Sequence, residues 1–247
     1  VTLAISDVPG DDLDVIGSGP TVPDLSTLAD ARAILAKYDI QLPDDVAAAL
    51  MDRASETPKA GHPAFGRTET HLVATPQRSL EAAAEHAAAR GYGALILGDA
   101  IEGESREVAK MHAAIAAQVA RHSQPGKAPL VLLSGGETTV TVRGSGRGGR
   151  NAEFLLALLV TLQERRPDCC RRISAIACDT DGIDGTEDNA GCVMSGDIFD
   201  RLENGLDHPK PYLADNNGYG FFEKAGGLVM TGPTLTNVND FRAILIE

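Results

Sequence analysis

The sequence predicts an α/β protein in which helices pack on sheets of largely parallel or mixed strands. Apolar runs that fit buried strands alternate along the chain with amphipathic helical segments, which is typical of this fold class. Hydrophobic residues make up 43% of the 247 residues, only 4% are aromatic and tryptophan is absent, so the core must consist mainly of Ala, Leu, Val and Ile. This composition favours helices packed on sheets, in one large or two modest domains.

The first part of the chain, residues 1–65, is expected to be the C-terminal part of a first α/β domain. A buried strand that begins at Val1 and ends at Asp7 precedes a loop rich in Gly and Pro. Helical periodicity then covers residues 26–38 and 43–55. The polar segment 56–69, which is rich in Pro and Gly, contains the expected domain boundary.

The second domain is expected to cover residues 66–247 and to begin with a β-α-β unit. Its first strand spans residues 70–75 and its second spans residues 94–99. The helix between them is predicted to have Thr75 as its N-cap and Gly91 as its C-terminal stop.

The remaining elements continue the alternation of strands and helices. Further strands are predicted over residues 129–136, 138–143, 173–179, 227–232 and 241–247. A helix over residues 104–122 should direct one stripe inward, consisting of Val108, Met111, Ile115 and Val119. A helix over residues 150–165 should direct another stripe inward, consisting of Phe154, Leu155, Leu158, Leu159 and Leu162. This order implies a largely parallel sheet with helices on both faces, in a three-layer α/β/α arrangement.

The charge balance limits the classes of partner. With 22 basic residues against 35 acidic ones, the formal net charge is -13, which argues against nucleic acids and anionic membranes. An anionic ligand is therefore expected to be small and held locally. The four cysteines have neither zinc-site nor disulfide-framework spacing, and no membrane span or signal peptide is found, so a cytoplasmic protein is expected.

A glycine-rich stretch, SGGETTVTVRGSGRGGRNAEF at residues 134–154, gathers positive charge in this acidic chain. It contains a G-x-G-x-x-G pattern between a strand and a helix, but the next strand ends at Asp179, about 30 residues later, whereas a dinucleotide fingerprint requires an acidic residue at the end of that strand about 20 residues later. An anion clamp fits better, with Arg147 and Arg150 supplying forked donors beside a helix N-terminus. A solvated turn is the alternative. The other residues expected to bind substrate or nucleotide here are Gly135, Gly136, Glu137, Gly144, Gly146, Gly148, Gly149 and Asn151.

An acidic loop follows the strand that ends at Asp179. Asp179, Asp181 and Asp184 lie close together in CDTDGIDGTEDNAG, at the edge of the sheet where ligands collect in open α/β folds. These carboxylates are candidate ligands for Mg²⁺, which prefers oxygen. Turn formation by Asp and Gly is the alternative.

Two further loops contribute weaker candidates. In SDVPGDDLDVIGSGPTVPD, Asp7 follows a strand, while Gly17 and Gly19 form a turn that could present backbone donors to a substrate. In TGPTLTNVNDFRAI, the hydrogen-bonding residues Thr234, Asn237 and Asn239 suit a polyol or a phosphate. Capping of the local backbone is the alternative for the second loop.

Together, these four stretches resemble the glycerate 2-kinase family with a MOFRL C-terminal domain. This family also bears an older label, hydroxypyruvate reductase, from tartrate-utilisation operons. The resemblance implies two unlike α/β/α domains with an active site between them, and it predicts that the chain is the C-terminal portion of such a protein. It also implies transfer of the ATP γ-phosphoryl group to a hydroxyl of D-glycerate, which gives 2-phosphoglycerate. A homodimer is one expected assembly.

The resemblance suggests a role for each group of candidate residues. Arg150, and secondarily Arg147, would neutralise the phosphoryl oxygens or the glycerate carboxylate. Asp179, Asp181 or Asp184 would hold Mg²⁺, and Asp7 would lie near the substrate hydroxyl. Two alternatives stay open, namely an NAD(P)H-dependent hydroxypyruvate reductase and a noncatalytic sugar-acid binding protein.

Overall fold

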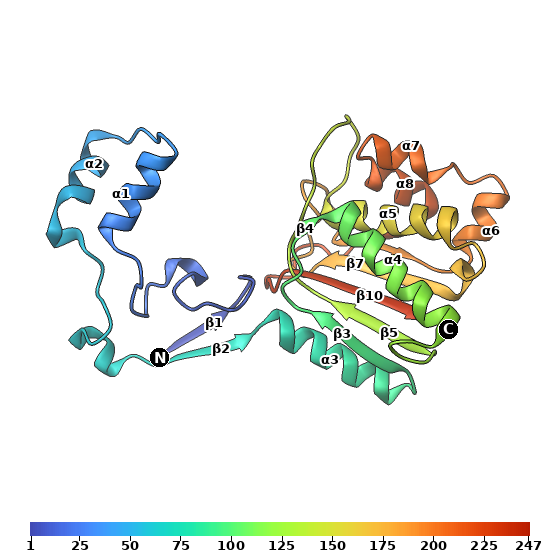
Figure 1. Ribbon diagram of the computed structural model, residues 1–247, viewed down its shortest axis with the longest axis horizontal. Helices are drawn as coiled ribbons and strands as arrows, with labels where there is room; N and C mark the ends of the chain where they lie inside the picture. Colours follow the sequence, from blue (N-terminus) through green and yellow to red (C-terminus); the bar gives the residue numbers. More distant parts are fainter. The chain divides into compact units, whose positions relative to one another are not determined.

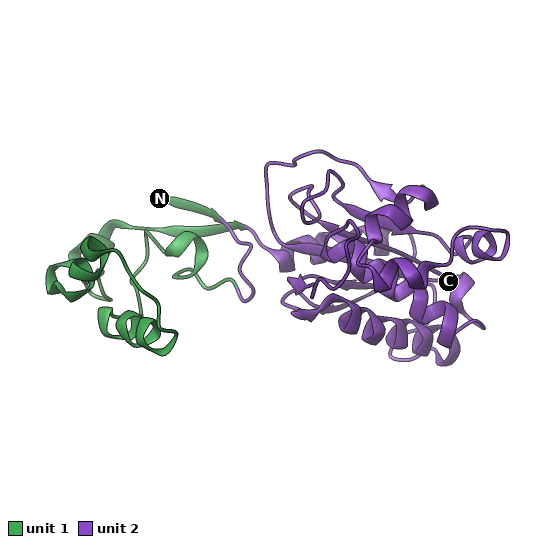
Figure 2. Cartoon of the chain, turned by 90° about the horizontal axis from the view of Figure 1, so that it is seen from above, with its two compact units in different colours: residues 1–4, 11–73 green, residues 5–10, 74–247 purple.

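The computed structural model describes residues 1–247, and the chain folds as two compact units, shown in green and purple in Figure 2. Unit 1 comprises residues 1–4 and 11–73, and unit 2 comprises residues 5–10 and 74–247. None of the helices is both long and apolar enough to span a membrane.

Unit 1 is built from short elements. Strand β1 (Thr2–Ile5) pairs with β2 (Thr70–Ala74) in a two-stranded sheet, and the helices are α1 (Leu28–Lys37) and α2 (Asp44–Met51). Local signals define α1, because Thr27 and Asp30 form a capping box at its start. Neither α1 nor α2 has a buried side chain, so unit 1 has no helical core of its own.

Unit 2 contains a mixed six-stranded sheet (Figure 1). Its strands, in spatial order, are β3 (Gly93–Gly98), β5 (Leu130–Ser134), β10 (Asp240–Ile246), β7 (Ile173–Asp179), β8 (Gly191–Met194) and β9 (Leu228–Val229). The α/β class and the mixed sheet are confirmed, but β3 and β5 are the only neighbouring strands of this sheet that pair in parallel. The expectation of a largely parallel sheet fails because β7 and β8 are joined by an irregular loop rather than by the crossover helix that a parallel pair needs.

Helices lie on both sides of this sheet. Figure 1 shows α4 (Ser105–His122) and α5 (Arg150–Arg165) on one side and α3 (Pro76–Ala89) on the other. Thr75 caps α3 as predicted, since its side chain accepts a hydrogen bond from the Arg78 N–H at 3.3 Å. Gly91, with φ +82°, follows the end of this helix.

The contact between α4 and α5 corrects one predicted stripe. On α4, Met111 is 42% exposed, and most of the buried positions are alanines, namely Ala109, Ala113, Ala116 and Ala117. These small side chains allow α5 to approach closely. The predicted stripe is wrong at Met111, whereas Val119 is buried and Val108 and Ile115 are partly buried against the core. The predicted inward stripe of α5 is confirmed, because all five of its side chains are fully buried.

The region between β8 and β9 holds three short helices that sequence periodicity did not predict. They are α6 (Ile198–Glu203), α7 (Pro209–Ala214) and α8 (Gly218–Ala225). The predicted strand over residues 138–143 shrinks to β6 (Thr138–Thr139), which pairs with β4 (Gly103–Glu104). Beyond β6 the backbone donates to side chains instead of a strand, as when the Thr141 N–H bonds the Glu104 carboxylate at 3.1 Å.

Candidate active site

The candidate active site of unit 2 lies where α5 begins, next to the end of β7 and the start of β10 in the middle of the sheet. In the sheet register, Asp240 at the start of β10 lies opposite Asp179 at the end of β7. Arg150 is the first residue of α5 and reaches both carboxylates. Residues 90 positions apart in the chain are thereby brought into one ionic cluster.

Arg150 is held by three carboxylates. Its Nε lies 2.8 Å from Asp240 Oδ1, one Nη lies 2.7 Å from Asp179 Oδ2, and the other lies 2.8 Å from Glu137 Oε1. Burial by itself would lower the pKa of Arg150, but Asp240, Asp179 and Glu137 raise it, so the guanidinium stays charged. Glu137 is 46% exposed while the two aspartates are almost fully buried, and it is therefore the partner that a bound anion can displace most readily.

A second arginine, Arg242, lies fully buried behind Arg150. It donates to the Gly135 carbonyl at 3.1 Å, to Thr138 Oγ1 at 3.2 Å and to Asp240 Oδ2. Asp240 thus bridges two arginines, with one oxygen on each. Burial lowers the pKa of Arg242, and Asp240 opposes that effect.

Sequence reasoning missed Asp240 and Arg242 as site residues. The signal was present in DFRAILI, because both charged residues occupy the inward face of β10 together with Ile244 and Ile246. A charged pair at inward positions of a strand requires partners, since an unpaired buried charge is costly. Asn151, which was predicted to bind ligand, is also an internal partner and donates from Nδ2 to Asp240 Oδ1 at 2.8 Å.

Asp184 caps the N-terminus of α5. Its two oxygens accept hydrogen bonds from the Asn151 N–H at 2.9 Å and the Ala152 N–H at 2.8 Å. Burial raises the pKa of Asp184 to about 6, and these two backbone hydrogen bonds act in the opposite direction. The positive end of the helix dipole therefore already faces an internal carboxylate. Gly149 is needed at this contact, because a Cβ there would lie 2.3 Å from Asp184 Oδ1.

The other two aspartates of the acidic loop have different surroundings. Burial raises the pKa of Asp179, while a backbone hydrogen bond from Asp181 and the charge of Arg150 lower it. Asp181 accepts the Ile183 N–H at 2.7 Å and lines an open pocket. No group of three His, Cys, Asp or Glu side chains is arranged to hold a metal ion. The three aspartates consequently do not fit a shared Mg²⁺ site as they lie.

The open pocket in unit 2 brings together three residues predicted from separate motifs, Asp7, Asp181 and Asn237. It has a volume of about 500 Å³, and Asn237 Nδ2 donates to Asp7 Oδ2 at 3.2 Å across it. Thr234 and Asn239 make local contacts instead: Thr234 Oγ1 donates to the Thr180 carbonyl, and the Asn239 carbonyl accepts the Thr180 hydroxyl. The remaining residues that line the pocket are Ile5, Ile183, Pro233, Leu235 and Thr236.

The glycine-rich loop uses most of its backbone donors within the protein. The N–H groups of residues 143–147 all donate to oxygens of Asp215, Asn216 and Asn217, at 2.8–3.3 Å. Arg147 donates from Nε to Glu187 at 3.1 Å, and its guanidinium lies 4.3 Å from the Tyr219 ring centre. The N–H groups expected to cradle an anion are thus occupied over the first half of the loop.

The other predicted glycines shape close contacts or turns. A Cβ on Gly136 would lie 2.1 Å from the Ile101 N atom, and Gly135 packs against the backbone of Asp99. Gly148, with φ +144°, lies beside the Tyr219 backbone. In unit 1, Gly17 and Gly19 adopt left-handed conformations with φ of +56° and +57°.

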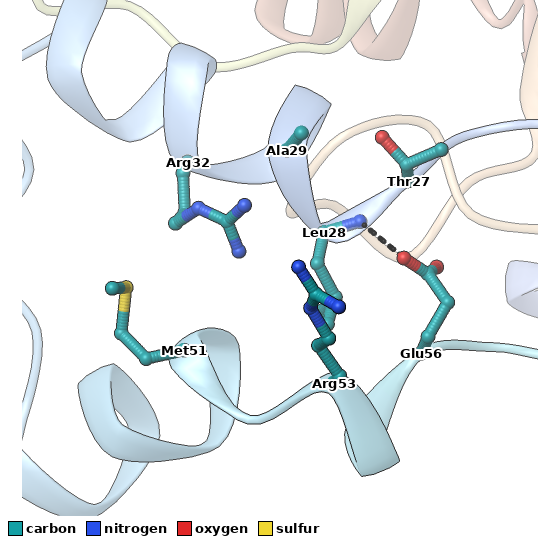
Figure 3. A pocket seen from close by; sticks show the side chains of 7 residues that line it. All are labelled: Thr27, Leu28, Ala29, Arg32, Met51, Arg53 and Glu56. Carbon is teal, nitrogen blue, oxygen red and sulfur yellow. Dashed lines mark hydrogen bonds between the residues drawn. The ribbon is translucent and has the colours of Figure 1, made fainter.

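A pocket of about 530 Å³ in unit 1 contains none of the predicted site residues (Figure 3). The side chains of Arg32, Met51 and Arg53 surround it, and Glu56 accepts the Leu28 N–H at 3.2 Å. Gly19 instead lines a smaller cavity of about 310 Å³ in the same unit. The helices α1 and α2 have no buried side chains, so the pocket beside them has no firmly packed wall. Its volume alone therefore does not identify a functional site in unit 1.

The mixed sheet, the carboxylate–arginine cluster at the ends of β7 and β10 and the pocket of Asp7, Asp181 and Asn237 define an α/β protein with a polar candidate site. Residues 130–240 match the MOFRL family, and residues 1–51 match a domain of unknown function, DUF4147. The chain therefore contains a region that matches the MOFRL family and is homologous to glycerate 2-kinases, as the sequence motifs predicted.

Similar proteins extend this assignment. The chain is 38% identical to the D-glycerate 2-kinase of Thermotoga maritima over 97% of its own length and 55% of that relative. The crystal structure of glycerate kinase from Thermotoga maritima matches with a TM-score of 0.86 at 37% identity, over 99% of the chain and 57% of that structure. A candidate hydroxypyruvate reductase of Agrobacterium vitis is 52% identical over the whole chain and 55% of the relative. The chain thus spans little more than half the length of these relatives.

Proposed function

We propose that the chain is part of an ATP-dependent kinase that phosphorylates D-glycerate to 2-phosphoglycerate. The observation that carries this proposal is the Arg150 cluster, whose Asp179 carboxylate also accepts the N–H of the pocket residue Asp181 at 3.1 Å, in a chain 38% identical to a D-glycerate 2-kinase. Phosphoryl transfer requires mainly positioning and charge neutralisation from the protein. A fixed guanidinium next to a polar pocket meets both requirements.

Arg150 is the residue we assign to charge neutralisation. Its Nε is committed to the buried Asp240, whereas the Nη that holds the exposed Glu137 can exchange this partner for a substrate oxygen. The displaced Glu137 carboxylate would then return to water at little cost. Arg147 contributes secondarily, because its side chain is 60% exposed and can turn toward a ligand.

Asp7 is the residue we place nearest the reacting hydroxyl of the substrate. It lines the pocket, and the amide of Asn237 orients its carboxylate. Of the aspartates proposed for Mg²⁺, only Asp181 lines this pocket. A Mg²⁺ requirement stays part of the proposal through the nucleotide, because Mg²⁺ usually keeps waters and substrate phosphates in its shell.

Hydroxypyruvate reduction is the second candidate, favoured by the names of two Agrobacterium vitis relatives at 52% and 44% identity. The glycine loop argues against it. A dinucleotide fingerprint needs free backbone N–H groups for the pyrophosphate, but those of residues 143–147 are bonded to residues 215–217. The antiparallel neighbours of β7 also differ from the parallel sheet of dinucleotide-binding folds.

One pair of assays on the complete protein separates the candidates. ADP release with D-glycerate and ATP is followed by a coupled assay, and NADH oxidation is followed with hydroxypyruvate. We expect ADP release without NADH oxidation, whereas NADH oxidation alone would select the reductase. If neither signal appears but calorimetry detects D-glycerate binding, the noncatalytic binding protein is correct. We also place the protein in the cytoplasm, in keeping with its four unpaired cysteines.

A further inference from the structure

The contact between the glycine-rich loop and the turn before α8 is unusually close. A Cβ on Gly144 would lie 2.3 Å from the Asp215 carbonyl oxygen, and a Cβ on Gly146 would lie 2.3 Å from Asn217 Cβ. Both glycines are therefore required by this contact between two segments about 70 residues apart. Gly144 and Gly146 are thus glycines because they pack against the turn of Asp215 and Asn217, and not because a ligand must approach the loop.

The turn supplies a matching row of acceptors. Asn216 Oδ1 accepts from the N–H groups of Arg143 at 2.8 Å and Gly144 at 3.1 Å. The Asp215 carboxylate and carbonyl accept from Ser145 and Gly146, each at 2.9 Å. Asn217 Oδ1 accepts from Arg147 at 3.3 Å. Five successive N–H groups of the loop thus end on three successive residues.

Asn216 is the member of the turn that is itself anchored in the core. It is 6% exposed, and its Nδ2 donates to Glu153 Oε1 at 3.4 Å. Glu153 is a buried residue of α5 and forms an ion pair with Arg106 of α4. Arg106 also donates to the carbonyl of Leu213, close to the turn. One side chain therefore connects the loop to the two central helices.

The loop leads directly into Arg150, and Glu153 lies one turn further along the same helix. A displacement of the loop would move the start of α5 and hence the guanidinium that Asp240 orients. We propose that Asn216 is a positioning residue, which fixes residues 143–147 through their backbone and thereby sets the place of Arg150 and Arg147. The turn of Asp215, Asn216 and Asn217 is then a clamp on the loop, and ligand contact is left to the arginine side chains.

The test uses Asn216→Gly in the complete protein. Asn216 has φ +54°, a conformation that glycine adopts without strain, so this change removes the side chain alone. Deuterium uptake of the backbone amides is measured by mass spectrometry, together with trypsin cleavage after Arg143 and Arg147. We expect the amides of Arg143 and Gly144 to exchange about 10-fold faster or more, because their acceptor is lost. Unchanged uptake and cleavage would overturn the clamp.

The kinetic part rests on the proposed function. A displaced Arg150 should lower kcat for D-glycerate about 10-fold, the equivalent of a weakened charge-assisted contact. The rate is expressed per folded molecule, with the folded fraction taken from circular dichroism, so a smaller folded fraction does not imitate this effect. Faster exchange with an unchanged kcat would therefore overturn the positioning role. If the unmodified protein has no kinase activity, the proposed function fails while the exchange measurement still decides the clamp.

Two further variants complete the design. Asn204→Ala is the matched control, since the Asn204 amide bonds only the exposed Asp200 carbonyl, at 2.8 Å; neither exchange in the loop nor kcat should change. If Asn216→Gly fails to fold, Gly146→Ala disturbs the same contact from the loop side, because its Cβ would collide with Asn217. It should accelerate exchange at residues 143–147, and normal protection in that variant would also contradict the clamp.

Discussion

Arg150 and Arg147 lie at opposite ends of the same two glycines, but their surroundings differ sharply. Arg150 is 24% exposed and its carboxylate partners Asp179 and Asp240 are almost fully buried, whereas Arg147 is 60% exposed and rests on Tyr219 beside Glu187. Ion pairs in water contribute little, while buried ones cannot lose a partner cheaply. The comparison teaches that clustered arginines in a sequence do not share one role, because burial separates them.

The largest effect should come from removing the carboxylate behind Arg150. Asp240→Ala leaves the buried Arg242 without its carboxylate partner and Arg150 without one of three, so we expect a loss of about 3 to 5 kcal/mol in the free energy of unfolding. Urea denaturation measures this loss. Asp200→Ala, which removes an exposed partner of Arg171, is the control and should cost less than about 1 kcal/mol. Equal losses in the two variants would contradict the role of burial.

Removal of the Arg150 side chain tests by activity whether the more buried of the two arginines has the catalytic role. Arg150→Ala should lower kcat for D-glycerate phosphorylation by about 10² to 10³, as the loss of one preorganised donor typically does. Arg150→Lys should recover only part of the rate, because an ammonium cannot bind two oxygens in one plane. Steady-state kinetics of the complete protein, with Arg165→Ala at the exposed end of α5 as control, measures the effect.

A different outcome would assign Arg150 a different role. An increase of KM with unchanged kcat would mean that the arginine binds the glycerate carboxylate equally in the ground and transition states. Unmodified values of both parameters would reduce Arg150 to a structural residue.

The pH dependence of stability tests whether the region around Arg242 is desolvated. His112 is buried, and its Nε2 lies 3.0 Å from Ser134 Oγ. Burial lowers the pKa of His112 to about 4, although a hydrogen bond to the Val108 carbonyl raises it and Arg242 lowers it further. The folded state thus favours the neutral ring, so its stabilising contribution is complete above pH 6.5 and is lost as the pH falls toward 4.

The measurement compares urea denaturation at pH 7.5 and pH 5. The free energy of unfolding of the unmodified protein should decrease from pH 7.5 to pH 5. In His112→Gln this decrease should be smaller by about 1 to 3 kcal/mol. His122→Gln, at the exposed end of the same helix, should retain the full decrease. If His112→Gln responds to pH like the unmodified protein, the region behind Arg150 is more hydrated than its burial indicates.

The smallest effect on stability and activity is expected from the exposed residue of the pair, Arg147. Arg147→Ala should leave the free energy of unfolding nearly unchanged, because water and salt screen its pair with Glu187 and its contact with Tyr219 is exposed. The rate should fall by less than about 10-fold, since Arg147 lacks the fixed setting of Arg150. A loss as large as that of Arg150→Ala would remove the distinction between the two arginines.

Local sequence signals predicted much of the fold. The capping residue Thr75 and the leucines of α5 were identified correctly, because side-chain chemistry and helical period determine them within a few residues. The direction of the strands was not predicted correctly, because β10, the last strand of the chain, lies in the middle of the sheet. The helices α6, α7 and α8 were missed because six to eight residues give too few turns for a clear period.

The sequence predicted several residues of the candidate site, although it missed Asp240 and Arg242, and it predicted their roles less well. Asp7, Asp181 and Asn237 come from three separate motifs and line one pocket. The role of Asp184 depends on the direction of its side chain, which spacing in a loop cannot determine, and its oxygens cap α5. Likewise, no feature of the glycine pattern indicates that its acceptors lie 70 residues later, in Asp215 and Asn217.

The position of β10 has a consequence for how the protein is made. This strand is translated after the other five strands of its sheet, and yet it lies between β5 and β7. A nascent chain that lacks it carries two separate sheet fragments with open edges, which are prone to pair with other chains. Since the same strand brings Asp240 to Arg150, sheet closure and assembly of the ionic cluster become one late event in biosynthesis. A ribosome that stalls before this strand therefore releases a chain without the cluster.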